Sequence, residues 1–416
     1  MSEFFDALET CDPAEREAAL MAALPAQVEH AQAHTGAFAD LLRGVDAASV
    51  NSRGALAGLP VIRKYELLER QQALRASDVF GGFSALKFGA GMRRVFASPG
   101  TIYEPEGTRA DYWRMARAMF AAGFRPGELV HNSFSYHFTP AGSMMETGAH
   151  ALGCTVFPGG TGQTEQQVAA MAELRPAGYI GTPSFLKIIV EKAAELGVPL
   201  PSVTKAMVSG EAFPPSLRDW LAERGVAGYQ CYATADLGLI AYETAAREGL
   251  VLDEGVIVEI VRPGTGDPVP EGEVGELVIT TLNPDYPLIR FGTGDLSAIL
   301  PGRCPTGRTA QRIKGWMGRA DQTTKVRGMF VHPGQVAEIV KRFPEVTRAR
   351  LVVTGEMAAD ALCLKVEAVT VAADGLAARL AETVRDVTKL RAEVELVAPG
   401  SLPNDGKVIE DARSYK

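Results

Sequence analysis

The sequence predicts an α/β fold with a large N-terminal domain and a smaller α+β domain at the C-terminus. Between residues 128 and 234, short apolar runs alternate with helical stripes, which is typical of βαβ units around a mostly parallel sheet. From residue 256 to 279, β-branched runs alternate with Gly and Pro turns, which favours hairpins and a small barrel-like part. We place the domain boundary so that the domains are 1–319 and 320–416.

Composition narrows the class of protein. The 416 residues are 46% hydrophobic and 22% charged, as in soluble globular proteins, and the length suggests two or three domains. A net charge of −8 argues against a nucleic-acid or anionic-membrane partner, although a local basic pocket stays open. The first six residues lack the basic and apolar parts of a signal peptide, and no apolar run approaches the length of a membrane span. Scattered cysteines, five in number, fit reduced thiols, so we expect a cytoplasmic protein.

The first candidate site lies after residues that alternate like a strand, 93–97. A loop of Ser, Thr and Gly follows from Ser98 through Gly100 and Thr101, and we expect a helix to begin at Thr108. A strand, such a loop and a helix can hold phosphate, because backbone N–H groups and the helix dipole point at the anion. No G-K-[ST] closes the loop, so it is not a Walker A motif, and a plain surface turn fits it equally well.

The parallel region predicts two further candidate spots. Strands are expected at 129–133, 155–157, 178–181 and 206–209, and helices at 166–174 and 183–196. Ligands on such sheets bind at the carboxyl ends of the strands. Two stretches directly follow strands: Ser209-Gly210-Glu211 and Tyr232-Ala233-Thr234-Ala235-Asp236. An aromatic ring beside a small residue offers a face to a planar base, and Asp236 could hold Mg²⁺ shared with phosphates.

Three later features complete the pattern. Asp295 directly follows a glycine after an apolar run and could accept hydrogen bonds from a ribose diol or form an Asx-turn. Residues 318–328 are rich in charge and glycine, which suits either an ordinary loop or a hinge between domains. Beyond them we expect helices at 333–342 and 376–390 and strands at 347–353, 361–367 and 393–397. Lys407 follows on a Gly-containing turn, where a lysine is ordinarily a solvated charge.

In this order the stretches resemble the AMP-forming acyl-CoA synthetase superfamily, most closely its phenylacetate–CoA ligase family, from about Leu59 to Lys407. In the N-terminal half, the family's phosphate loop is resembled by Ser98-Pro99-Gly100-Thr101 with Pro105, its adenine-side turn by Ser209-Gly210-Glu211, and its Y-G-x-[ST]-E segment by Tyr232 to Asp236. Further along, the ribose segment is resembled by Arg290 to Asp295 and the hinge by Arg319-x-Asp321 with Lys325 and Gly328. The catalytic-lysine loop is resembled by Pro403 with Gly406-Lys407. The phosphate loop departs from the family pattern at Ile102 and Tyr103, and Glu104 and Glu106 add negative charge beside it.

The resemblance implies an enzyme that uses ATP, Mg²⁺ and coenzyme A to activate a carboxylic acid as an acyl-adenylate. It implies that Lys407 and Asp236 are catalytic, with Asp236 also holding the metal. It implies that Tyr232 stacks on adenine, that Asp295 and Arg319 hold the ribose, and that the small domain rotates about Asp321. Whether the chain forms a homodimer is left open at this point.

The acid is expected to contact Tyr136, His137, Phe138 and Leu237, whose aromatic and apolar character suits an aryl or small apolar acid. His137 could touch the carboxylate or serve only as a structural histidine. Two alternatives to the CoA ligase stay open: a relative that binds nucleotide or acyl-CoA without efficient adenylation, and an adenylating enzyme that serves a carrier protein or an amine.

Overall fold

A computed structural model describes residues 3–99, 101–322, 324–326, 329–355, 361–368 and 375–413. Packing divides the chain into two compact units. Unit 1 comprises Met1–Val258, Ile279–Phe291 and Leu300–Trp316, and unit 2 comprises Glu259–Val278, Gly292–Ile299 and Met317–Lys416. No helix among the described residues is both long and apolar enough to cross a bilayer.

A nine-stranded sheet, traced through the described residues, organises unit 1. Its strands, in spatial order, are β14 (Ile299–Leu300), β15 (Arg312–Ile313), β10 (Leu250–Leu252), β9 (Gly238–Tyr242), β8 (Ala227–Thr234), β7 (Lys205–Val208), β6 (Gly178–Gly181), β4 (Leu129–Asn132) and β5 (Thr155–Pro158). From β8 to β5 all neighbours are parallel, whereas β9 and β10 continue the sheet antiparallel. The predicted parallel sheet is confirmed.

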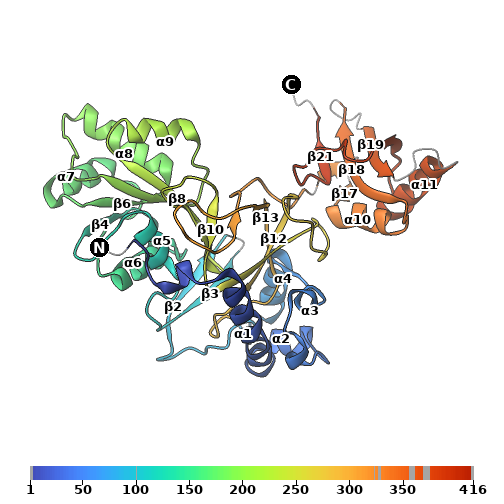
Figure 1. Ribbon diagram of the computed structural model, residues 1–416, viewed down its shortest axis with the longest axis horizontal. Helices are drawn as coiled ribbons and strands as arrows, with labels where there is room; N and C mark the ends of the chain where they lie inside the picture. Colours follow the sequence, from blue (N-terminus) through green and yellow to red (C-terminus); the bar gives the residue numbers. More distant parts are fainter. Residues whose placement is uncertain are drawn as a thin grey trace. The chain divides into compact units, whose positions relative to one another are not determined.

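Both faces of the inner parallel strands β4, β6 and β7 are buried, which explains their mostly apolar sequences. Ile180 and Met207 face a core shared with α5 (Met115–Ala121) and α6 (Ala141–Leu152). Tyr179 and Val208, their neighbours along the strands, face the opposite core. That second core is covered by α7 (Thr164–Leu174), α8 (Pro183–Glu195) and α9 (Pro215–Ala222), as Figure 1 shows. The helices predicted at 166–174 and 183–196 are α7 and α8.

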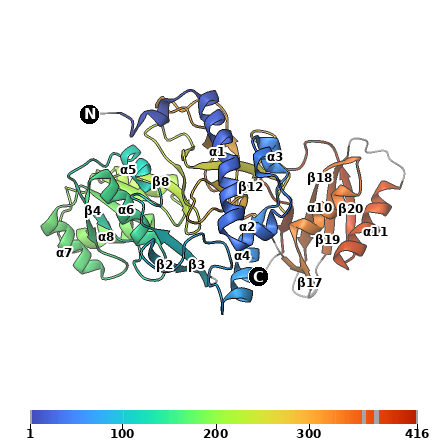
Figure 2. The same ribbon diagram turned by 90° about the horizontal axis from the view of Figure 1, so that it is seen from below.

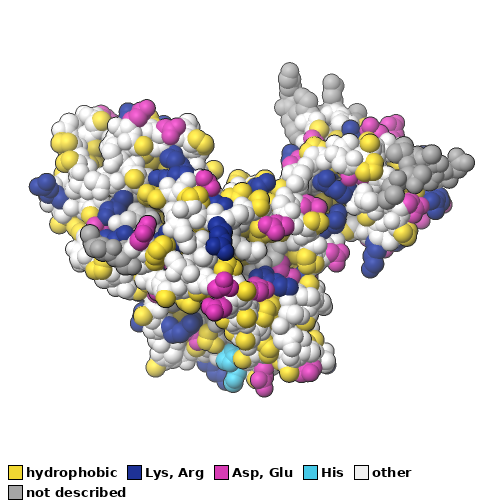
Figure 3. All heavy atoms as spheres, in the orientation of Figure 1, with side chains coloured by type: hydrophobic (Ala, Val, Ile, Leu, Met, Phe, Trp, Pro, Cys, Tyr) yellow, Lys and Arg dark blue, Asp and Glu magenta, His cyan; other side chains and the backbone are white. Residues whose placement is uncertain are grey.

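Helices also form the N-terminal part. They are α1 (Pro13–His34), α2 (Gly36–Leu41), α3 (Arg53–Ala57) and α4 (Lys64–Leu74), and α1, α2 and α3 lie together in both ribbon views (Figures 1 and 2). The carboxylate of Asp12 accepts from the N–H groups of Ala14 and Glu15 and thereby caps α1. Over the face drawn in Figure 3, basic and acidic side chains are interspersed.

The loop-and-helix prediction for residues 98–120 is wrong. Residues after Ser98 turn back as a hairpin, in which β2 (Met92–Ser98) pairs antiparallel with β3 (Ile102–Gly107). The helix begins only at Met115, because Asp111 and Arg114 have left-handed backbones with φ of 47° and 63°. The Asp111 carboxylate then accepts from the N–H of Ala116 in the first turn. Neither left-handed residue is a glycine, so no residue type marked this break in advance.

A second, four-stranded sheet has the order β1 (Ile62–Arg63), β13 (Phe291–Ser297), β12 (Gly275–Thr281) and β11 (Val256–Val261). The strands predicted within 256–279 are thus present. Arg290, which precedes β13, is fully buried, and its guanidinium donates to the carbonyls of Ala57 and Leu59. The N–H of Ile62 donates to the Arg290 carbonyl at 3.0 Å, which anchors β1.

The C-terminal part of unit 2 is a two-layer α+β structure, as predicted. Its sheet has the order β20 (Glu393–Val397), β19 (Ala361–Ala368), β18 (Val346–Thr354) and β21 (Ile409–Asp411), covered by α10 (Pro333–Lys341) and α11 (Leu376–Thr388). Its core contains Val336, Ile339, Leu364, Leu380 and Val384. A short hairpin of β16 (Thr324–Val326) and β17 (Met329–Val331) precedes it.

Candidate functional site

In unit 1, the two candidate spots after β7 and β8 lie next to each other. The Ser209 hydroxyl donates to the carbonyl of Cys231 at 2.9 Å, and Cys231 directly precedes Tyr232 in β8. Gly210 has a φ of 84°, a conformation that favours glycine, and the next residue turns back toward α8. There the Glu211 carboxylate accepts from the N–H of Ser184 at 2.7 Å. The geometry therefore joins both predicted spots at the carboxyl ends of neighbouring parallel strands.

The stretch from Tyr232 to Leu237 forms the β8–β9 turn. Tyr232, Ala233 and Thr234 are half-buried, and the register shifts between Tyr232 and Ala233. The Thr234 hydroxyl accepts from the N–H of Leu237 at 3.2 Å. Leu237 is buried, and its carbonyl accepts from Arg114 at 2.8 Å, so this residue is packed into the protein.

The acid of this turn is Asp236, which is buried with 4% of the residue exposed. Its Oδ2 accepts from the ammonium of Lys64, the first residue of α4, at 2.9 Å. Its Oδ1 is buried and has no hydrogen-bond partner within the described part of the chain. Such an unsatisfied carboxylate oxygen fits a missing ligand, and a hard cation such as Mg²⁺ prefers this kind of oxygen.

The hairpin of β2 and β3 stands where the phosphate loop was expected, and side chains hold it in place. Gly100 itself lies outside the described residues. Gln71 of α4 both donates to the carbonyl of Tyr103 and accepts from its N–H, at 2.9 and 2.8 Å. Arg75 donates to the carbonyl of Thr101 at 2.8 Å. Thr101 is exposed with a φ of 57°.

Ser98 is engaged by an acid from the same hairpin. Its hydroxyl and its N–H donate to the two carboxylate oxygens of Glu104, which is completely buried. Burial, followed by the negative charge of Asp236, raises the pKa of Glu104 to about 8. The charge of Lys64 acts in the opposite sense on the same carboxyl. Sequence reasoning identified neither Glu104 nor Lys64 as part of the site.

Of the predicted acyl-binding residues, Tyr136 and Leu237 are packed into the protein, whereas His137 and Phe138 are exposed. Asn132, buried at the end of β4, donates from Nδ2 to the hydroxyl of Tyr136 and to the carbonyl of Gly142, both at 2.8 Å. Burial and a hydrogen bond to the Glu146 carboxylate raise the pKa of Tyr136, so its hydroxyl is held inside the protein. His137 and Phe138 are exposed, and Phe138 has a φ of 60°. Leu237, as described above, is buried.

In unit 2, the predicted ribose-binding residues form an ion pair. The Arg319 guanidinium donates to Oδ1 of Asp295 at 2.8 Å while 54% of its side chain stays exposed. Gly294 has a φ of 73° and lies against that guanidinium, where a Cβ would collide with it. Asp321 is exposed, and its neighbour Gln322 donates to the carbonyl of Gly406 at 2.8 Å. Gly328 lies outside the described residues, as does the Lys325 side chain.

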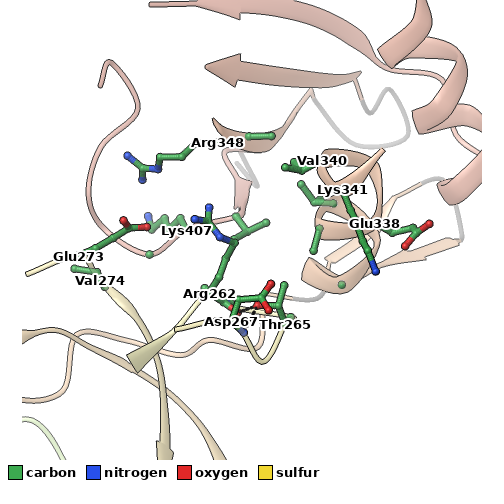
Figure 4. A pocket seen from close by; sticks show the side chains of 18 residues that line it. Arg262, Thr265, Asp267, Glu273, Val274, Glu338, Val340, Lys341, Arg348 and Lys407 are labelled. Atoms are coloured by element: carbon green, nitrogen blue, oxygen red, sulfur yellow. Dashed lines mark hydrogen bonds between the residues drawn. The ribbon is translucent and has the colours of Figure 1, made fainter. Parts of the chain in front are cut away.

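Lys407 is exposed on a loop that two arginines of β18 hold in place. Arg348 and Arg350 donate to the carbonyls of Leu402 and Pro403 at 3.2 and 3.1 Å. The Asp405 carboxylate accepts from the N–H of Lys407 at 3.0 Å. Lys407 lines a pocket of about 550 Å³ within unit 2, together with other cations (Figure 4): Arg262, Lys341 and Arg348. The lining also includes acids: Asp267, Glu273 and Glu338.

Known protein families match two parts of the chain. The family of AMP-binding enzymes matches residues 110–283, and the C-terminal domain of AMP-binding enzymes matches residues 328–412. A phenylacetate–coenzyme A ligase of Thermus thermophilus is 32% identical over 400 residues, covering 87% of this chain and 88% of the relative. One of Escherichia coli is 30% identical, covering 76% of this chain and 77% of the relative.

A solved structure is similar over nearly the whole chain. It is an open conformation of 2-hydroxyisobutyryl-CoA ligase in complex with 2-HIB-AMP and CoA, 26% identical, with a TM-score of 0.73. The match covers 97% of this chain and 92% of that one.

Proposed function

The chain belongs to the phenylacetate–CoA ligase family of AMP-binding enzymes, and from that premise we propose which residues activate the acid and transfer it to CoA. It is an AMP-forming acid–CoA ligase. One observation supports the proposed site in particular: Ser209, Tyr232 and Asp236 lie at or just beyond the carboxyl ends of two adjacent parallel strands, where ligands of such sheets bind.

We propose that the first half-reaction joins the acid to the nucleotide. A carboxylate oxygen attacks the α-phosphorus of ATP, the bond to the bridging oxygen breaks, and pyrophosphate leaves with its electron pair. Negative charge gathers on the α-phosphate, and the ammonium of Lys407 stabilises it. Asp236 would hold Mg²⁺ through its unpartnered Oδ1, and the ion would neutralise charge on the phosphates.

The proposal assigns the other parts of the nucleotide to residues singled out by the sequence. Tyr232 stacks on adenine, and the backbone turns at Ser209-Gly210-Glu211 and at Ala233-Thr234 line the base. Asp295 accepts from the ribose hydroxyls, oriented by its ion pair with Arg319. Ser98, Gly100 and Thr101 bind the outer phosphates. Because the Ser98 hydroxyl donates to Glu104 in the structure, binding phosphate through that hydroxyl requires it to leave Glu104.

In the second half-reaction the thiolate of CoA attacks the acyl carbon and AMP leaves. The 2-hydroxyisobutyryl-CoA ligase structure was obtained with both acyl-AMP and CoA, which supports this order. Rotation of the small domain about Asp321 would withdraw Lys407 before the thiol enters.

The acid itself is proposed to be aryl or small and apolar. Tyr136, His137, Phe138 and Leu237 remain the proposed contacts. Tyr136 is half-buried and Leu237 is buried, while the exposed Phe138 and His137 would cover a bound acid.

Release of pyrophosphate tests the proposal. The chain, ATP and Mg²⁺ are mixed with phenylacetate, benzoate, 2-hydroxyisobutyrate or acetate, with and without CoA. We expect acid-dependent release without CoA, and continuous turnover to acyl-CoA and AMP when CoA is added. The buried Glu104 in the phosphate turn favours one alternative, a protein that binds nucleotide without adenylation. Absence of release with every acid would support that alternative, and release without CoA-dependent turnover would indicate a carrier-protein or amine acceptor.

A further inference from the structure

The β8–β9 turn, which carries Asp236, is held by an arginine that directly precedes α5. The Arg114 guanidinium donates through Nη2 to the carbonyls of Leu237 and Leu239, both at 2.8 Å. These carbonyls lie on either side of Gly238, immediately after Asp236 in the chain. One side chain therefore fixes the backbone of the segment that follows the acid.

A buried carboxylate holds the arginine itself in place. Nε of Arg114 donates to Oδ2 of Asp253 at 2.6 Å, and only 2% of the Asp253 side chain is exposed. The same oxygen accepts from the N–H of Gly255 at 3.0 Å. A Cβ on Gly255 would lie 2.6 Å from Cδ of Arg114, so this glycine leaves the space that the arginine side chain occupies. The guanidinium thus joins one carboxylate to two carbonyls, a task for which its planar set of donors is suited.

The backbone beside Arg114 bonds to the same turn. The Trp113 carbonyl accepts from the N–H of Leu239 at 3.0 Å. Gly238 has a φ of 75°, and a Cβ there would lie 2.8 Å from that carbonyl. Arg114 has a left-handed backbone, which is unfavourable for a residue other than glycine and persists only where surrounding contacts enforce it. Two consecutive residues therefore hold the turn, one through its backbone and one through its side chain.

The anchored segment and the proposed nucleotide-binding residues belong to one short stretch of chain. The Thr234 hydroxyl accepts from the N–H of Leu237 at 3.2 Å, so a shift of Leu237 is passed on to Thr234. Tyr232 precedes Thr234 in β8, and Asp236 directly precedes Leu237. A displacement of about 1 Å at a reacting centre can lower a rate by about 10²-fold. The position of this backbone should therefore decide how well Tyr232 and Asp236 meet the nucleotide.

We propose that Arg114 is a positioning residue for adenylation. It sets the backbone of the β8–β9 turn through the carbonyls of Leu237 and Leu239, and Asp253 fixes its own orientation. The inference rests on the proposed function for the roles of Tyr232 and Asp236. Arg114 itself acts through the turn, without touching nucleotide or acid.

Two variants and a matched control test this role in the full chain. Arg114→Lys keeps a positive charge beside Asp253, but a single ammonium does not reproduce the planar donor set that serves a carboxylate and two carbonyls. Arg114→Met removes the charge as well. The control is Arg125→Met, because Arg125 also donates to two backbone carbonyls, those of Phe120 and Phe124, which are not part of the turn.

Hydrogen exchange of the protein without ligands measures the anchor directly. The N–H groups of Leu237 and Leu239 are both hydrogen-bonded, so they report opening of the turn in peptides that contain them. We expect both Arg114 variants to exchange there about tenfold or more faster than wild type, and Arg125→Met to exchange at the wild-type rate. Wild-type exchange in the Arg114 variants would overturn the proposal.

The kinetics of acid-dependent pyrophosphate release supply the second readout. A displaced turn should raise the KM for ATP about fivefold or more and lower kcat about tenfold or more. A fraction of unfolded enzyme lowers the apparent kcat and leaves KM unchanged, so the KM distinguishes positioning from mere stability. Arg125→Met should keep the wild-type KM for ATP. If Arg114→Met does not fold, Arg114→Lys decides, and thermal unfolding shows that each variant is folded.

The outcomes separate this inference from the proposed function. Wild-type KM and kcat in Arg114→Lys would sink the positioning role alone, even if exchange in the turn were faster. An equal rise of the KM for ATP in Arg125→Met would assign the effect to general loosening and would also contradict the role. If wild type released no pyrophosphate with any acid, the proposed function would fall. Hydrogen exchange would then still decide whether Arg114 anchors the turn.

Discussion

Lys407 carries the positive charge on which the proposed first half-reaction depends. A lysine on a Gly-containing turn is ordinarily a solvated charge. It was predicted to be catalytic only because the other motifs of the family precede it in the family's order. The structure adds that Arg348 and Arg350 hold its loop while the residue stays exposed. An exposed ammonium on a fixed loop is suited to meet a phosphate, since it loses little packing when it moves.

Replacing Lys407 by Ala should lower adenylation by about 10²–10³-fold, because the charge on the α-phosphate loses its cation. Formation of acyl-CoA from a supplied acyl-adenylate should be spared. The two half-reactions are measured separately, as acid-dependent pyrophosphate release and as thioester formation. Lys341→Ala, which removes another cation of the same pocket, should leave both near wild type. Equal loss of both half-reactions in Lys407→Ala would refute the assigned role.

Asp111 offers a prediction about stability and pH. Burial raises the pKa of its carboxyl from 3.8 to about 6. The folded state therefore binds the proton more tightly than the unfolded state, so the carboxyl costs stability as pH rises from about 4 through 6. Asp111→Asn should raise stability at pH 7.5 by about 1–3 kcal/mol, because two pKa units correspond to roughly 3 kcal/mol. Asn also tolerates the left-handed backbone at this position.

Thermal unfolding at several pH values provides the measurement. The advantage of Asp111→Asn should shrink as pH falls toward 4. Asp46→Asn is the control, because Asp46 is an exposed acid that likewise accepts from a helical N–H, that of Ala48. A constant advantage across this range would mean that packing, and not ionisation, decides the effect.

The residues that sequence reasoning missed share a physical reason. Lys64 meets Asp236 across 172 positions of the chain, and no local pattern reveals such a contact. Glu104 was noted for its charge, but its burial and its bonds to Ser98 depend on the hairpin. A sequence motif can single out a residue, but it cannot reveal groups that only tertiary packing brings together.

At the scale of elements, apolar runs between turn residues predicted the strands well. β6 and β20 have the predicted bounds, because each is a short run that Gly or charged residues delimit. The helix expected at Thr108 was wrong, since the left-handed Asp111 and Arg114 delay its start. The hairpin of β2 and β3 was missed because Gly100 and Pro99 suggested an open loop.

Gln71 should be the residue that fixes this hairpin to α4. Gln71→Ala leaves the N–H and the carbonyl of Tyr103 without their partner, which should cost about 1–3 kcal/mol of stability. Urea unfolding measures the change. The matched control is Gln72→Ala, since Gln72 is exposed on the same helix and should alter stability by less than about 0.5 kcal/mol. Equal effects of the two substitutions would show that helix propensity, and not the hairpin contact, is responsible.

At the scale of the whole molecule, the sequence predicted an α/β part and an α+β part, and both are present. The compact units do not follow the chain order, because segments 259–278 and 292–299 group with the C-terminal residues. No local pattern could show this grouping. We propose nonetheless that 320–416 moves as a domain, with its pivot at Asp321.

A proline at the pivot tests that movement. Proline restricts φ to about −65°, so Asp321→Pro should block rotation of the backbone there. We expect adenylation to continue while conversion of the acyl-adenylate to acyl-CoA is largely lost. Asp321→Ala, which removes the side chain but leaves the backbone free, should retain both half-reactions. If Asp321→Ala lost acyl-CoA formation as Asp321→Pro does, the missing carboxylate would explain the loss, and blocked rotation of the backbone would not.

The central claim is that a carboxylate oxygen of the acid bonds to the α-phosphorus of ATP. Transfer of an oxygen isotope tests this bond directly. Phenylacetate labelled with ¹⁸O in both carboxylate oxygens is turned over with ATP, Mg²⁺ and CoA, and the masses of the products are measured by mass spectrometry. The account predicts one ¹⁸O in AMP and one in phenylacetyl-CoA. ADP in place of AMP, with ¹⁸O in inorganic phosphate, would mean that the acid is activated as an acyl phosphate and would contradict the account.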